Sequence, residues 1–304
     1  MTPFLPLMQR EWLQHRFAWA LLALVPLALT LVLVSFGQVE FDLGEPDFQS
    51  TGLPAFITLA SVTASTAIVF LILWLTSLFI TTGLPRRDHG DRSIEFWLSL
   101  PVGHAPSLAV PMLVHLVLVP AAALGIGLLG GHAISLVLVT RFVGLSAWFG
   151  LPWAEVLAAT LALTLRLLAG LPLATLWLLP VVLLAMLARA WIGRWGLPVL
   201  ALALGLGGLL LDRALGQPLL MQWLGNLGRR AAEAMVGASG ASFQARQVDE
   251  AVAALQGLPG WALRDLGAAL GALATPAMAV GLAVSAACFA LLVDWRQRGT
   301  KAAD

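Results

Sequence analysis

The stretch Arg86–Pro101, RRDHGDRSIEFWLSLP, is the largest polar interruption between two long apolar runs of this sequence. Uncharged tracts border or overlap it on both sides, at residues 48–85 and 96–140. Its pattern predicts a short helix outside a membrane, because Asp88 or Asp91 can cap the first turn and a carboxylate suits the positive end of the helix dipole. The sequence on either side is therefore expected to enter the membrane.

The predicted short helix has an apolar face and a polar face. Ile94, Trp97 and Leu98 fall at i, i+3 and i+4, which places them on the same side. Arg92 and Glu95 lie largely away from that side. Two interpretations follow: a cytoplasmic loop helix that lies on lipid headgroups or on its own chain, and a docking helix for a soluble partner.

The composition of the whole chain favours a membrane protein. Hydrophobic residues make up 60% and charged residues 11%, whereas soluble domains carry roughly 25% charged residues. A bilayer core about 30 Å thick requires about 20 apolar helical residues. Uncharged tracts that reach or approach this length occupy residues 17–39, 48–85, 96–140, 167–188, 195–211 and 266–293. We expect an all-α polytopic membrane protein with about six transmembrane helices.

The expected layout is a single transmembrane domain over residues 1–304. Its parts are an N-terminal interfacial helix 1–16, span 1 at 17–36, span 2 at 54–84, the cytoplasmic loop 86–101, span 3 at 105–130, span 4 at 153–188, span 5 at 196–211, an extracytoplasmic helical segment 212–265 and span 6 at 266–293. Residues 131–153 either extend span 3 beyond the bilayer or form a re-entrant piece. Span 4 is a candidate for division at Gly170–Pro172.

Basic residues in the short connections predict the orientation. Lys and Arg gather in the N-terminal segment, in 86–101, in 189–194 and after residue 293, whereas the 37–52 connection is acidic. Cytoplasmic loops carry the excess of basic residues, so both termini and the 86–101 loop are expected in the cytoplasm. Tyr is absent and Lys occurs once, a bias that suggests a GC-rich bacterial genome and hence a multi-pass protein of the bacterial inner membrane.

A possible intramembrane polar path comprises His115 in span 3 and Glu155 and Arg166 in span 4. Glu155 and Arg166 share a helix face but lie about 16 Å apart along the axis. An arginine at the bilayer centre costs about 2.5–3.5 kcal/mol on insertion scales, so Arg166 is expected to face protein, water or the interface. His104, His115 and His132 are too far apart in sequence for one local metal cluster, and we expect no metal site.

Common catalytic and nucleotide motifs are absent from the sequence. It contains no GxxxxGK[ST] phosphate loop, no HExxH and no GxSxG, so the chain is not expected to bind ATP in that way or to be an enzyme. The single cysteine, Cys288, excludes an internal disulfide. We expect no bound cofactor.

Three stretches resemble the membrane subunit of bacterial type-2 ABC exporters. They are the basic, Trp-containing N-terminal helix MQREWLQHRFAW (8–19), the loop RRDHGDRSIEFWLSLPVGH (86–104) and the long polar segment 212–265. Members of that family commonly carry an arginine- and aspartate-rich string in the loop, followed by a serine, an aromatic pair and LP-V. The resemblance in layout covers nearly the whole chain, and the loop is its specific motif.

The resemblance implies that Asp91–Leu100 is a coupling helix that docks into a separate ATPase. Its coupling residues would be Asp91, Arg92, Ile94, Glu95, Phe96, Trp97 and Leu98. It implies a cytoplasmic ABC ATPase dimer that carries the ATP and Mg, and a second permease copy, either identical or a paralogue. The substrate would pass between the two permeases. Membrane lipid is the other expected contact, and no nucleic acid is expected.

Two other classes of function compete with a permease. One is a non-transporting membrane anchor or assembly subunit whose cytoplasmic helix recruits a partner. The other is an intramembrane lipid-modifying enzyme that uses His115, Glu155 or Arg166, which their scatter along the chain disfavours. An ion-coupled carrier is disfavoured because the apolar tracts hold so few charges.

Overall fold

The computed structural model describes residues 4–37, 52–90, 103–240 and 250–301, and this part of the chain contains helices and turns but no strand. Five of its helical segments are long and apolar enough to cross a membrane: Phe4–Phe36, Gly52–Arg87, His104–Phe142, Trp153–Ala214 and Pro276–Arg298. The all-helical class and the long apolar helices are therefore confirmed, and they are compatible with a multi-pass membrane protein.

The first two helices each cover more than one of the expected elements. Helix α1 (Phe4–Phe36) joins the expected interfacial helix to span 1 without a break. Helix α2 (Gly52–Gly90) continues past Pro85 through the first five residues of the expected loop. Arg86 and Arg87 bind neighbouring helices, as described below, and these contacts stabilise that last turn.

The third long apolar segment consists of α4 (His104–Leu113), the π-helical turn η1 (Val114–Leu118) and α5 (Val119–Phe142). Pro120 has no N–H to donate to the Leu116 carbonyl four residues earlier. The Thr175 hydroxyl of the neighbouring helix donates to this carbonyl instead, at 3.3 Å. Helix α5 continues past the expected end of span 3 to Phe142, and a separate short helix follows it.

A short helix, α6 (Leu145–Phe149), leads into α7 (Trp153–Ile192), the longest helix of the structure. Helix α7 runs unbroken through Gly170–Pro172 and Pro180, so the possible division of span 4 does not occur. Neighbouring helices allow proline in membrane helices, and α7 contacts α2, α9, α10 and α11. It ends at Ile192, and the next residue, Gly193, has a φ of 71° that suits glycine.

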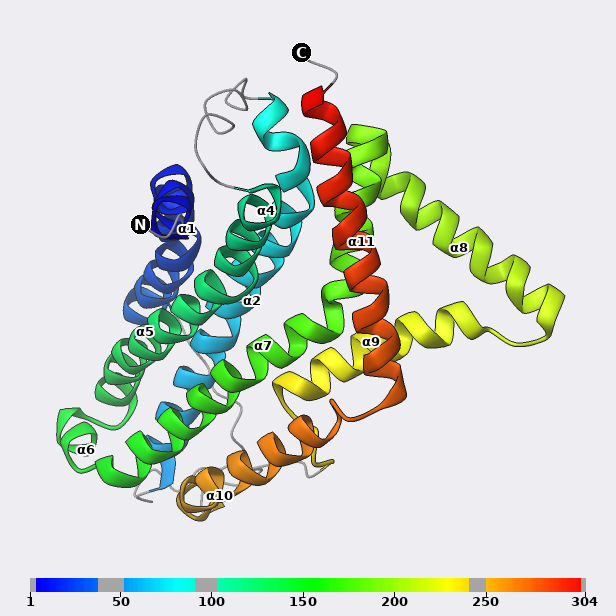
Figure 1. The fold of residues 1–304 in the computed structure, drawn as a ribbon. Coiled ribbons are helices and arrows are strands. Elements are labelled where there is room, and N and C mark those ends of the chain that lie inside the picture. Colours follow the sequence, from blue (N-terminus) through cyan, green and yellow to red (C-terminus); the bar gives the residue numbers. More distant parts are fainter. Residues whose placement is uncertain (1–3, 38–51, 91–102, 241–249, 302–304) are drawn as a thin grey trace.

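The last four helices are α8 (Gly196–Leu215), α9 (Leu219–Met235), α10 (Glu250–Gly271) and α11 (Pro276–Lys301). The turn η2 (Gly193–Trp195) separates α7 from α8 within the single apolar segment Trp153–Ala214. Helix α8 leaves the bundle and α9 returns to it, so the two form a projecting arm (Figure 1). The final apolar helix begins at Pro276 and not at Leu266, because α10 continues to Gly271 and proline suits the first turn of a helix.

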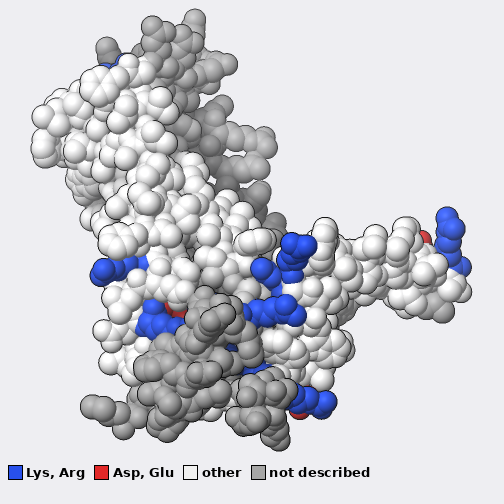
Figure 2. Space-filling view, turned by 90° about the horizontal axis from the view of Figure 1, so that it is seen from above, with Lys and Arg blue, Asp and Glu red and all other residues white. Residues whose placement is uncertain are grey.

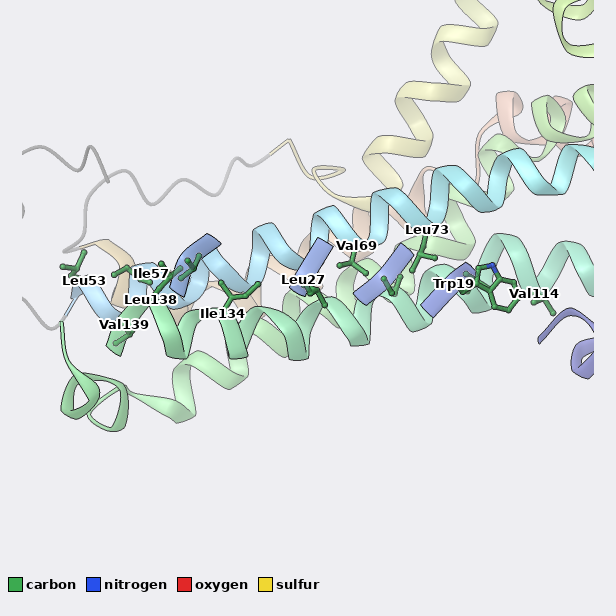
Figure 3. Close-up of a cluster of buried hydrophobic side chains, with 14 residues drawn as sticks. Trp19, Leu27, Leu53, Ile57, Val69, Leu73, Val114, Ile134, Leu138 and Val139 are labelled. Atoms are coloured by element: carbon green, nitrogen blue, oxygen red, sulfur yellow. The ribbon is translucent and has the colours of Figure 1, made fainter. Parts of the chain in front are cut away.

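The packing of α1, α2 and α5 forms one long apolar core (Figure 3). It runs from Leu53 at one end to Trp19 and Val114 at the other. Two glycines of α5 allow close backbone contact, since a Cβ on Gly127 would lie 2.6 Å from the Thr66 Cα. A Cβ on Gly131 would lie 2.5 Å from the Val62 Cα. Small residues at membrane helix interfaces allow this approach.

The predicted basic segments meet at one end of the bundle. The end of α2, the start of α4, the α7–α8 junction and the C-terminus lie at the top of Figure 1. Figure 2 looks onto this end and shows several groups of basic side chains there, with another group at the end of the α8–α9 arm. The grouping expected from the positions of Lys and Arg is therefore present in the fold.

Candidate functional site

Four charged or titratable side chains from three helical segments meet at this basic end, and we call them the Glu11 cluster: Glu11, His15, Arg87 and His115. Arg87 binds the Glu11 carboxylate through both terminal nitrogens, with Nη1 at 2.8 Å from Oε2 and Nη2 at 2.6 Å from Oε1. His115 Nε2 lies 3.1 Å from Oε2. The Glu11 and His115 side chains are 0% exposed. Such two-pronged charged hydrogen bonds are strong and fix geometry.

The local structure explains how these residues converge. Glu11, His15 and Trp19 succeed one another at i, i+4 and i+8 on α1, so they share one face. The π-helical turn η1 places His115 against this face, with its ring centroid 5.3 Å from that of His15 and 5.5 Å from that of Trp19. Arg87 reaches the cluster from the last turn of α2. Single-turn π-helical segments are frequent at functional sites.

A second arginine fastens the same end of α2 to α7. Arg86 Nε donates to the Ala190 carbonyl at 3.0 Å, and Nη2 donates to the Trp191 carbonyl at 3.3 Å. These carbonyls belong to the last turn of α7, where free carbonyls and the helix dipole favour a cation. Arg189 of α7 donates in turn to the Thr82 hydroxyl at 2.9 Å. The end of α2 is therefore tied to α1 on one side and to α7 on the other.

A separate buried ion pair joins α7 to α10. Arg166 donates to Asp265 Oδ2 from Nε at 3.0 Å and from Nη2 at 2.8 Å, and both side chains are 0% exposed. Arg166 Nη1 also donates to the Ala234 carbonyl at the end of α9, at 2.8 Å. The backbone N–H groups of Gly237 and Ser239 donate to Asp265 at 3.0 Å and 2.7 Å. We call this arrangement the Arg166 latch.

The Arg166 latch keeps Asp265 ionised. Burial opposes the charged form and by itself would raise the pKa of Asp265. Hydrogen bonds from Ser239, Gly237 and Arg166 outweigh burial, so this pKa lies below its ordinary value. The paired charges and the hydrogen bonds together satisfy the buried carboxylate, which suits a structural connection between α7, α9 and α10.

The structure places the residues of the expected polar path in different surroundings. His115 belongs to the Glu11 cluster and Arg166 to the Arg166 latch, while Glu155 lies half-buried in the first turn of α7. In the described part of the chain, no hydrogen bond or ion pair joins these three side chains to one another. The seven expected coupling residues, from Asp91 to Leu98, lie outside the described residues.

Three residues that the structure makes central were not predicted as site residues from the sequence: Glu11, Arg87 and Asp265. The i, i+4 spacing of Glu11 and His15 was a usable sign, because it places a carboxylate and an imidazole on one helix face. Asp265 directly precedes an uncharged tract, as an acidic partner for a buried arginine can. Neither sign identifies the partner, which comes from a distant part of the chain.

Comparison with known proteins gives no relative: no family model, no curated protein sequence and no solved structure matches this chain.

Proposed function

We propose that this chain is the permease subunit of an ATP-binding-cassette exporter in a bacterial inner membrane. Asp91–Leu100 would dock onto a separate cytoplasmic ATPase, and a second permease copy would complete the substrate path. ATP hydrolysis would occur on the partner. The observation that carries the proposal is the attachment of the α2 end, directly before that loop, to both α1 and α7.

These attachments suit a coupling role. A loop that is pushed by a partner can move a membrane domain only if the adjoining helix ends transmit the displacement. Arg87 ties α2 to α1, and Arg86 ties α2 to α7. Helix α7 in turn contacts α9, α10 and α11. A displacement at the loop would therefore reach most of the bundle through direct contacts.

The charge distribution also suits a soluble partner at this end. Several arginine side chains lie there (Figure 2). Cytoplasmic loops of membrane proteins carry such an excess. The apolar residues Ile94, Trp97 and Leu98 supply anchors of the kind that helices use in grooves.

The proposal is tested by purifying the tagged full chain from native membranes in mild detergent and identifying the proteins that accompany it. A stoichiometric soluble protein with a GxxxxGK[ST] loop is expected. Trp97→Ala and Glu95→Arg should reduce its recovery at least tenfold, with membrane insertion unchanged. Asp212→Ala is the matched control, because Asp212 is exposed in the last turn of α8 on the projecting arm.

The competing functions predict different outcomes. Absence of an ATPase, under conditions that preserve other membrane complexes, would contradict the proposal. An ATPase whose recovery is unaffected by both loop variants would contradict the coupling role of Asp91–Leu100. If the reconstituted complex hydrolyses ATP without stimulation by any exported substrate, a non-transporting anchor is the better description.

A further inference from the structure

The Glu11 cluster brings together three side chains that commonly bind metal ions. One imidazole nitrogen from His15, one from His115 and one carboxylate oxygen from Glu11 all lie within 4.8 Å of one another. Two histidines and one carboxylate are the donor set of several zinc sites that keep a fourth position open. Imidazole ligands also suit the neighbouring divalent transition metals.

The spacing of the two most buried donors fits coordination to a single ion. His115 Nε2 and Glu11 Oε2 are 3.1 Å apart. Zinc–nitrogen and zinc–oxygen bonds of roughly 2.0–2.2 Å at a tetrahedral angle place two ligand atoms about 3.3 Å apart. The two atoms are therefore spaced as two ligands of one metal ion, which would replace the proton between them.

The third donor is placed by helix geometry. His15 follows Glu11 by four residues on α1, so both side chains project from one face. The same i, i+4 spacing presents paired ligands on helices in zinc enzymes. In the described part of the chain, His15 Nε2 has no hydrogen-bond partner although it is buried. The residue as a whole is half-buried, which leaves a route for an ion to enter.

Arg87 determines which ligand can complete the site. It already compensates the charge of Glu11 through both carboxylate oxygens. A carboxylate has about four lone-pair positions, so Glu11 can bind an ion while it still accepts from Arg87. A divalent ion bound beside Arg87 would give this buried site a net positive charge, which is unfavourable unless an anion also binds there. An anionic fourth ligand, such as hydroxide or a phosphate, would reduce this charge.

We propose that Glu11, His15 and His115 form a binding site for one divalent transition metal ion of the zinc class, with the fourth position open to an anionic ligand. The site connects α1 to η1, and Arg87 connects it to α2. This inference does not depend on the proposed permease function, because it rests on the donor set and its geometry alone.

The test is metal binding by the purified full chain in detergent after treatment with a chelator. Zn²⁺ affinity is measured by competition with a chromophoric chelator, and Co²⁺ is used as a second probe because its visible absorption reports coordination geometry. We expect one ion per chain. His15→Ala and His115→Ala should each weaken Zn²⁺ binding at least tenfold, and His132→Ala should leave it unchanged, because His132 bonds a backbone carbonyl elsewhere in the bundle.

Two results would overturn the proposal. One is a stoichiometry well below one ion per chain for the unmodified protein. The other is Zn²⁺ affinity in folded His15→Ala that equals that of the unmodified protein. Since His115 is fully buried and its replacement can disturb folding, the half-buried His15 provides the deciding variant, with circular dichroism and size-exclusion profiles as the check on its fold.

Discussion

Arg166 on α7 and Asp265 on α10 form a buried ion pair in which two guanidinium nitrogens, Nε and Nη2, donate to one carboxylate oxygen, Oδ2. The residues are 99 positions apart in sequence. Around them, the end of α9 contributes the Ala234 carbonyl at 2.8 Å and the Glu233 carbonyl at 3.5 Å to the arginine, and the turn after it contributes two N–H groups to the aspartate. One pair of charges therefore holds three helices together.

We expect Asp265→Asn to destabilise the protein strongly. The substitution removes the negative charge and leaves Arg166 buried without compensation, and breaking a buried pair in this way costs about 3–5 kcal/mol. Thermal unfolding in detergent, followed by circular dichroism, measures the loss. Glu233→Gln is the matched control, because Glu233 is partly exposed and pairs with Arg229 and Arg230 at the surface. Such pairs contribute about 0–1 kcal/mol, and equal effects of the two substitutions would contradict the latch.

The Arg166 latch should also depend on pH. Because the pKa of Asp265 is lower in the folded protein than in the unfolded chain, ionised Asp265 contributes stability above the unfolded value of about 3.9. This contribution is lost as the pH falls below about 4 towards the folded pKa. Unfolding midpoints measured from pH 7 to pH 3 should fall more steeply for the unmodified protein than for Asp265→Asn. Parallel pH curves would show that Asp265 is not the titrating group.

The close approach of α2 and α5 makes a clear prediction about Gly131. A Cβ there would lie 2.5 Å from the Val62 backbone, so Gly131→Ala must push the two helices apart. Overpacking of this kind typically costs about 1–3 kcal/mol. Gly125→Ala on the same helix meets no atom within 4 Å and should be neutral or slightly stabilising, since alanine favours helix. Thermal unfolding of the two variants compares them directly, and an equally stable Gly131→Ala would argue against this packing.

The Glu11–Arg87 pair should show strong energetic coupling. Glu11→Gln and Arg87→Met each break this largely buried pair, and breaking a buried pair costs about 3–5 kcal/mol, so each should destabilise the chelator-treated protein by about that amount. The double substitution removes both charges and should cost clearly less than the sum of the two single effects. A double-mutant cycle on unfolding free energies measures this difference. Strict additivity would show that the two side chains do not interact in solution.

Much of the fold was predictable from local sequence. A helix needs about 20 apolar residues to cross a bilayer, and a stretch of that length can be recognised from its own residues alone. The long uncharged tracts therefore predict apolar helices without knowledge of the rest of the chain. The position of the basic segments at one end of the bundle was also predictable, because pairs of apolar helices separate these segments along the sequence. The predicted helix ends were less accurate. Helix α5 continues past the predicted residue 130 to Phe142, because contacts with neighbouring helices stabilise its last turns. Helix α11 begins at Pro276 and not at residue 266, because residues 266–271 belong to α10.

The candidate site depended on tertiary structure. The sequence places His115 and Arg166 among apolar residues, where an ionisable side chain carries a free-energy cost. Each of these side chains is therefore expected to have a hydrogen-bonding or charged partner. It does not say which acid supplies that partner, because Glu11 precedes His115 by 104 positions and Asp265 follows Arg166 by 99. Hydropathy is a property of neighbouring residues and determines that these segments are helices. The crossing and rotation of those helices determine which side chains meet, and only the packed bundle decides that.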